Sequence, residues 1–186
     1  MSVAERTLAL AHRVAAELAR RDLPSCVIGA AALAVHSYAR ATHDMDLATL
    51  VRTDRELDEL AEDLRASGLE VHVAHAGATD APGSVMTIEE EGANPVQVVN
   101  FFNPWNGWVP AGKAALEHAL PSALGELAVA DVPHLVALKL YAGGRKSALD
   151  VVELLARQPP RTVTEAQAVC EGLGLGDALR TALDGR

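Results

Sequence analysis

Apolar side chains recur every three to four residues near both ends of the chain, and they alternate with polar ones through its middle. The first pattern predicts amphipathic helices, and the second predicts strands with one buried face. Glycine- and proline-rich segments separate these elements. We expect strands at residues 25–29, 44–51, 70–75, 84–89 and 96–102. We expect helices at residues 3–21, 30–38, 54–67, 111–120, 132–142, 147–157, 164–173 and 175–183.

The order of these segments predicts an α/β (α+β) fold, in which a mixed sheet is flanked by helices and followed by a helical C-terminal third. We divide the chain into an α/β core at residues 1–104 and a helical part at residues 105–186, which packs on the core as a single compact unit. A chain of 186 residues is too short for two fused enzymes. A fold of this class does not by itself assign a function.

Composition excludes several classes of protein. With 49% hydrophobic and 22% charged residues, the chain is globular rather than disordered or fibrous. No apolar run approaches the roughly 18 to 20 residues of a membrane span, so we expect no membrane partner. Cys26 and Cys170 form neither a disulfide framework nor a metal-ligand spacing, which predicts a reduced, cytoplasmic setting. The net charge of −9 opposes general binding to nucleic acid, so any such contact has to be local.

Two carboxylates, Asp44 and Asp46, stand two positions apart on a predicted strand. Side chains alternate along a strand, so both carboxylates project from the same face. Such a pair is costly without a cation between the charges, and its oxygen ligands suit Mg²⁺ together with substrate phosphates. The alternative is a strand-end turn with two solvated carboxylates.

A glycine turn at Gly29 lies fifteen positions before Asp44 and opens the predicted helix at residues 30–38. If the two predicted strands are neighbours, the backbone amides of Gly29 and Ala30 face the same phosphates as the aspartates. Arg40 and Thr42 continue the alternation of the aspartates, so they point at the same pocket if the strand starts early. Arg40 is otherwise a surface or ion-pairing residue.

Residues 27–47 resemble the signature of the nucleotidyltransferase superfamily, which combines a glycine turn, a helix and an Arg-x-Thr-x-Asp-x-Asp-Leu strand. They are most similar to the minimal nucleotidyltransferases of the AbiEii/AbiGii toxin type. The resemblance implies a Mg²⁺-dependent enzyme that moves a nucleoside monophosphate from a nucleoside triphosphate to a hydroxyl on RNA, a protein or a small molecule. It also implies a role as the toxin of a toxin–antitoxin pair, with an antitoxin protein as partner.

A second segment, residues 131–155, resembles the Leu-x-x-Lys-Leu-x-Ala and Arg-x-x-Asp-hydrophobic-x-x-Leu segments of the same family. The helix around Lys139 is apolar on nearly all sides, so this lysine needs a structural carboxylate or a functional role. The resemblance implies that Lys139 binds the nucleotide phosphates and that Asp150 lies in the active site with Asp44 and Asp46. Asp150 is alternatively an ordinary acid in the first turn of a helix, since Gly143-Gly144 is expected to break the helix between the two residues.

Two departures from the family pattern leave the activity open. Alanines replace the second family glycine and its neighbour, and Gln97 stands where many nucleotidyltransferases have a third carboxylate. Glutamine can bond a phosphate or a water but cannot act as a general base. Glu70 or Glu89 is a candidate substitute. The alternatives to an active enzyme of the toxin type are a catalytically weakened binding module and an aminoglycoside-type nucleotidyltransferase with a cationic substrate.

The remaining candidates have ordinary interpretations. The histidines, including His72, show no metal-ligand spacing supported by a neighbouring motif. Trp105 and Trp108 flank a glycine turn, which is more typical of a packed anchor than of a stacking platform.

Overall fold

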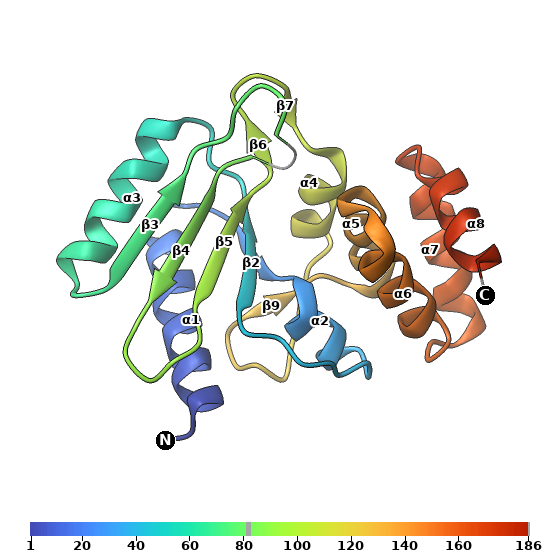
Figure 1. The fold of residues 1–186 in the computed structure, drawn as a ribbon, viewed down its shortest axis with the longest axis horizontal. Helices are drawn as coiled ribbons and strands as arrows, with labels where there is room; N and C mark the ends of the chain where they lie inside the picture. Colours follow the sequence, from blue (N-terminus) through green and yellow to red (C-terminus); the bar gives the residue numbers. More distant parts are fainter. Residues whose placement is uncertain (81–82, 186) are drawn as a thin grey trace.

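A seven-stranded mixed sheet runs through the middle of the molecule in the order β3-β4-β5-β2-β1-β9-β8 (Figure 1). The computed structural model describes residues 1–80 and 83–185. Strand β2 is parallel to β5, and β1 is parallel to β9, while the other neighbours are antiparallel. The strands are β1 (Ser25–Val27), β2 (Met45–Thr49), β3 (Glu70–Ala74), β4 (Val85–Glu89), β5 (Val96–Asn100), β8 (Leu120–Pro121) and β9 (Ala128–Val129), and β6 (Phe102–Asn103) and β7 (Gly107–Trp108) form a separate two-stranded ribbon.

The helices lie on both sides of the sheet and form most of the C-terminal third (Figure 1). They are α1 (Val3–Arg20), α2 (Gly29–Val35), α3 (Asp54–Ala66), α4 (Pro110–Glu117), α5 (Val132–Ala142), α6 (Gly144–Leu155), α7 (Pro160–Gly172) and α8 (Gly176–Asp184). Several begin as their sequences predict: Ser2, Thr53 and Asp131 cap α1, α3 and α5 by accepting a backbone N–H bond.

Helices α1 and α3 cover one face of the sheet, and the main core lies between these helices and the sheet. Because side chains alternate along each strand, every second residue of β2 to β5 turns toward these helices. These core positions are apolar and buried: Met45, Leu47, Val71, Met86, Ile88, Val96 and Val98. The alternation in the sequence therefore sets which face of each strand is buried.

The opposite face of the sheet carries a row of polar side chains that runs across four strands. His72, Thr87, Gln97 and Asp46 are paired in register from β3 to β2. Among the described residues, no helix lies in front of β3 and β4 on this side (Figure 1). Helix α4 packs against β1 and β2, where Cys26 Sγ lies 3.9 Å from the carbonyl oxygen of Ala115. Asp46 thus lies at the boundary between the uncovered part of this face, at β3 and β4, and the part that α4 covers.

The predicted fold class is confirmed, and the differences concern the ends of elements and the shortest strands. The helix expected at residues 30–38 ends at Val35, because Ser37 adopts a left-handed conformation (φ 70°). The strand expected at residues 44–51 spans Met45–Thr49, so Asp44 precedes it. The two-residue strands β8 and β9 were not expected. The division of the chain at residue 104 stays a prediction. Strand β9, which follows residue 104, pairs with β1 in the main sheet.

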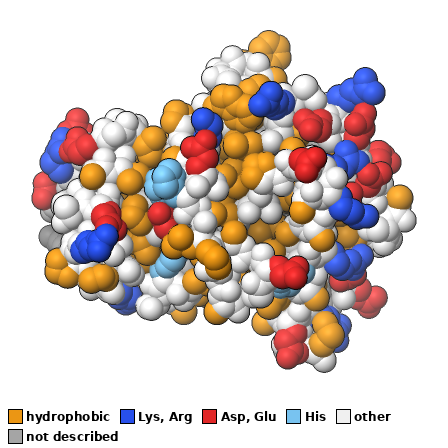
Figure 2. All heavy atoms as spheres, turned by 180° about the vertical axis from the view of Figure 1, so that it is seen from behind, with side chains coloured by type: hydrophobic (Ala, Val, Ile, Leu, Met, Phe, Trp, Pro, Cys, Tyr) orange, Lys and Arg blue, Asp and Glu red, His pale blue; other side chains and the backbone are white. Residues whose placement is uncertain are grey.

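The surface differs from expectation at the tryptophans. Trp105 is 69% exposed and Trp108 is 37% exposed, so packing as an anchor is wrong for Trp105. Cys26 and Cys170 are buried free thiols. Among the described helices, none combines the length and apolarity needed to cross a membrane. Seen from behind, acidic and basic side chains crowd the side of the molecule formed by α3, and apolar side chains lie across the middle (Figure 2).

Candidate functional site

Asp46 on β2 lies directly against Gly29, the first residue of α2. The backbone amide of Ile28 donates to the carbonyl oxygen of Asp46 at 2.9 Å, which holds the strand beside the turn. A Cβ atom built on Gly29 would overlap Oδ2 of Asp46 and come within 2.8 Å of its Cγ. Gly29 also has a positive φ of 63°, a conformation that other residues adopt at a cost. Only glycine therefore fits this turn without displacing the Asp46 carboxylate.

Burial and a second carboxylate raise the pKa of Asp46 to about 6. Desolvation is the larger cause, and the negative charge of Asp44 is the next. The positive charges of Lys139, Arg40 and Lys146 act in the opposite direction and lower the pKa of this carboxylate. The two aspartates therefore form a crowded acidic pair beside three basic side chains.

Asp44 lies in the loop before β2 and accepts a hydrogen bond from the hydroxyl of Thr42 at 2.5 Å. Its position two residues before Asp46 places it near the same carboxylate, as the effect on the pKa of Asp46 indicates. Thr42 thus orients one member of the acidic pair.

A group of three charges, Arg40, Lys139 and Asp150, lies beside the acidic pair. Arg40 donates from Nε to Oδ1 of Asp150 at 3.0 Å and from Nη2 to Oδ2 at 3.2 Å. Lys139 Nζ lies 2.8 Å from the same Oδ2. The side chain of Asp150 is only 2% exposed. A buried carboxylate held by two cations has its hydrogen bonds satisfied, so Asp150 orients Arg40 and Lys139.

The break between α5 and α6 brings Lys139 and Asp150 together. Gly143 and Gly144 both have positive φ, 69° and 80°, and they end α5 and begin α6. The chain turns there, so Lys139 in the last turn of α5 meets Asp150 in the middle of α6. The structure contains the expected helix break. It also shows Lys139 paired with a structural carboxylate and Arg40 in an ion pair, as expected.

Gln97 lies next to Asp46 on the parallel strand β5. This is the neighbouring position that a third carboxylate would use, and here its side chain is an uncharged amide. Glu70 and Glu89 do not take its place. Glu89 is on β4, separated from β2 by β5, which puts the two backbones about 10 Å apart. The substitution by Glu70 or Glu89 is therefore wrong for this fold.

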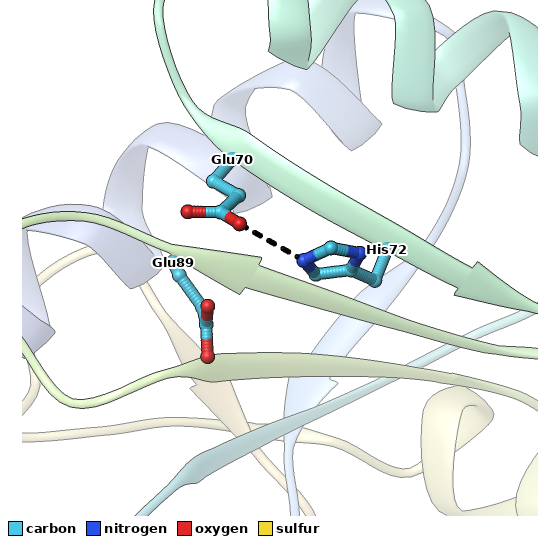
Figure 3. A group of neighbouring side chains, drawn as sticks. All are labelled: Glu70, His72 and Glu89. Atoms are coloured by element: carbon cyan, nitrogen blue, oxygen red, sulfur yellow. Dashed lines mark hydrogen bonds and ion pairs between the residues drawn. The ribbon is translucent and has the colours of Figure 1, made fainter.

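Glu70, His72 and Glu89 form their own group on the exposed surface of β3 and β4 (Figure 3). Their potential ligand atoms lie within 4.8 Å of one another, and His72 Nε2 is 3.1 Å from Glu70 Oε1. Glu70 and Glu89 are direct cross-strand partners at the edge of the sheet. All three side chains are exposed, and the histidine hydrogen bond accounts for the arrangement, so we assign no role to it.

Lys146 is a cation near the acidic pair that the sequence analysis did not single out. It lies in the first turn of α6 and acts on Asp46, although 100 positions separate them in the chain. The sequence signal for it is Arg145-Lys146, which directly follows two glycines. Cations in the first turn of a helix are unfavourable beside the positive end of the helix dipole, so their presence there indicates a functional role.

The donor set of the acidic pair fits a hard divalent cation. Asp44 and Asp46 offer only oxygen ligands on neighbouring positions, and their mutual repulsion is relieved by positive charge between them. Asp46 is partly buried, so water screens its charge less than at the surface, which makes the relief larger. Mg²⁺ satisfies these demands when its remaining positions are filled by water and phosphate oxygens.

Comparison with known proteins identifies the fold. Neither a protein-family model nor a curated protein sequence matches the chain significantly. An antigenic nucleotidyltransferase-like protein from Paracoccidioides brasiliensis aligns over 100% of this chain and 95% of its own, with 16% identity and a TM-score of 0.53. ANT(2″)-Ia in complex with adenylyl-2″-tobramycin aligns over 96% and 97%, with 18% identity and a TM-score of 0.51. The solution structure of the antibiotic-resistance factor ANT(2″)-Ia aligns over 97% and 91%, with 15% identity and a TM-score of 0.51. The chain therefore has the fold of nucleotidyltransferases.

Proposed function

We propose that this protein is a member of the nucleotidyltransferase superfamily that moves a nucleoside monophosphate from a nucleoside triphosphate to a hydroxyl acceptor. The observation that supports it best is the contact between Asp46 and Gly29, with Asp44 and three cations around it, in a nucleotidyltransferase fold. An acidic pair, a glycine turn and basic side chains are the groups that a metal-bound triphosphate requires.

Each residue of the site has a part in this reaction. Asp44 and Asp46 would hold Mg²⁺, which neutralises the phosphates and polarises the α-phosphate. Gly29 and Ala30 bring backbone amides next to Asp46, and Thr42 orients Asp44. The acceptor oxygen attacks the α-phosphorus and its hydroxyl proton passes to water, while the bond to the β-phosphate breaks and pyrophosphate leaves with the negative charge.

The basic residues stabilise the charge that shifts to the leaving pyrophosphate. Lys139 pairs with Asp150 and its charge lowers the pKa of Asp46, and Arg40 is fixed by two hydrogen bonds to Asp150. In this arrangement Asp150 is a positioning residue, because its two oxygens are engaged by these cations. Gln97 offers an amide to a water or a phosphate next to the metal.

The experiment is incubation with α-labelled nucleoside triphosphates, Mg²⁺ and a cell extract. We expect label in an acceptor with the wild type and none with the Asp44→Ala, Asp46→Ala double variant. Asp177→Ala, on the exposed surface of α8, is the matched control and should transfer normally. Transfer that survives the double substitution contradicts the roles of the aspartates. Nucleotide-dependent thermal stabilisation without transfer would favour the weakened binding module instead, for which Gln97 is the motivating residue.

The finer assignment to the AbiEii/AbiGii toxin type, with an antitoxin protein as partner, rests on the two segments at residues 27–47 and 131–155. If it is correct, induced expression of the wild type arrests growth of a host cell, and expression of the aspartate double variant does not. Growth arrest by both would assign the toxicity to something other than nucleotidyl transfer.

A further inference from the structure

A groove of about 1030 Å³ opens among the C-terminal helices, between the end of α5, one side of α6 and α8. Its volume reaches the upper end of the range for small-molecule sites. Lys139 lines the groove, and its Nζ also lies 2.8 Å from Oδ2 of Asp150, which binds Arg40. The groove therefore adjoins the group of Arg40, Lys139 and Asp150.

The charged residues of the groove are mostly basic. Lys139, Arg145 and Lys146 line it, against a single carboxylate from Glu153. Lys139 is paired with Asp150, but neither Arg145 nor Lys146 takes part in an ion pair within residues 1–80 and 83–185. In a protein with a net charge of −9, two such cations at one groove are a local exception that favours an anionic ligand.

The rest of the groove is apolar. Its lining includes Leu140, Leu149, Val152 and Ala178. Leu149 is 56% exposed and offers the largest exposed apolar side chain of this lining. A ligand that fits this lining has an apolar surface as well as negative charge.

We propose that the groove receives the acceptor, and that the acceptor is a nucleotide unit. Its phosphate contacts Arg145 and Lys146, and its base lies on Leu149. The inference rests on the proposed function, because it places the acceptor hydroxyl beside the acidic pair. It also separates this protein from ANT(2″)-Ia with its adenylyl-2″-tobramycin, since a polycationic acceptor would meet the cations of this groove.

The test is direct binding of a short, fluorescein-labelled single-stranded RNA to the full chain, measured by fluorescence anisotropy. We expect Arg145→Glu to weaken binding roughly tenfold or more, since it reverses a charge at the phosphate. Leu149→Glu should weaken it as well, and it changes an exposed residue, so the variant should fold normally. Arg161→Glu on α7, which is 90% exposed and outside the groove, is the matched control and should bind like the wild type.

Competition with a nucleoside monophosphate and with unlabelled RNA identifies the source of the phosphate. Displacement by the monophosphate assigns the groove to single nucleotides, and displacement by unlabelled RNA alone assigns it to a strand; both support a nucleotide acceptor. Binding that Arg145→Glu leaves unchanged overturns the inference. Mg²⁺-dependent binding of a non-hydrolysable triphosphate, lost in Asp46→Asn, reports on the proposed function separately.

Discussion

Gly29 and Asp46 occupy adjoining space so closely that a side chain at residue 29 would coincide with the carboxylate of residue 46. The two residues come from different elements, the start of α2 and the strand β2, and the Ile28 amide fixes them to each other. The turn and the acidic strand therefore form one unit. A change in the turn is transmitted directly to the aspartate that would bind the metal.

Gly29→Ala should lower both stability and Mg²⁺ affinity. The new methyl group has to push the Asp46 carboxylate aside, and the positive φ adds about 1–2 kcal/mol of backbone strain. Gly68→Ala is the matched control, because Gly68 also has a positive φ but a methyl group added there would meet no described atom within 4 Å. Urea denaturation and calorimetric Mg²⁺ titration measure the two effects. Equal losses in the two variants would mean that the contact with Asp46 has no consequence.

Asp46→Asn should stabilise the protein at pH 8 in the absence of divalent ions. The folded-state pKa of Asp46 is raised by burial and by Asp44 to about 6, from an ordinary value of 3.8. The folded protein thus keeps a proton that the unfolded chain releases, and the free energy of unfolding falls as the pH rises through this window. At about 1.4 kcal/mol per pKa unit, the cost above pH 6 is at most about 3 kcal/mol.

Thermal unfolding with and without Mg²⁺ checks this prediction. The asparagine variant and the wild type should converge near pH 4, and Mg²⁺ should raise the Tm of the wild type but not of the variant. A variant that is less stable than the metal-free wild type at pH 8 would contradict the electrostatic argument.

Asp150→Asn should cost roughly 3–5 kcal/mol, because it leaves Arg40 and Lys139 without the buried carboxylate that they share. Glu165→Gln provides the control: it breaks an exposed pair with Arg161 on α7 and should cost less than about 1 kcal/mol. Denaturant unfolding measures both. If transfer falls in Asp150→Asn while stability is unchanged, Asp150 acts in the chemistry rather than by positioning its two partners.

Gln97→Asp should increase the rate of transfer several-fold, since it adds a carboxylate beside Asp46 that can accept a proton. In the absence of Mg²⁺ the same change should destabilise the protein by up to about 1 kcal/mol, because like charges then lie directly across two strands. Gln97→Ala separates the new charge from the loss of the amide. A rate that falls equally in both variants would show that the amide itself is required.

The buried face of each strand could be predicted because it depends on alternation over a few neighbouring residues, and the acidic pair could be predicted because its two members are only two positions apart. Asp44 and Asp46 lie near each other, and Leu47 and Val98 are buried as the period of two requires. The two-residue strand β9 could not be predicted, because it is too short to show a period. Its place beside β1 depends on packing around Val27 and Val129.

The basic side of the site was only partly accessible from the sequence. Lys139 stood out because it is charged in an apolar helix, and the family resemblance implied that Asp150 lies in the active site. Lys146 was missed, because its effect on Asp46 depends on the direction in which α6 leaves the turn at Gly143. Two consecutive glycines allow many directions for the following helix, so this direction is set by the packing of the folded chain.

The shared salt bridge of Arg40, Lys139 and Asp150 joins the segment before β2 to the two helices that follow the sheet. A design that moves β2 and its aspartates to another protein would therefore have to include these two helices as well. Evolutionary change in either half is constrained by the other: an altered charge at one of the three positions calls for a compensating one elsewhere in the trio.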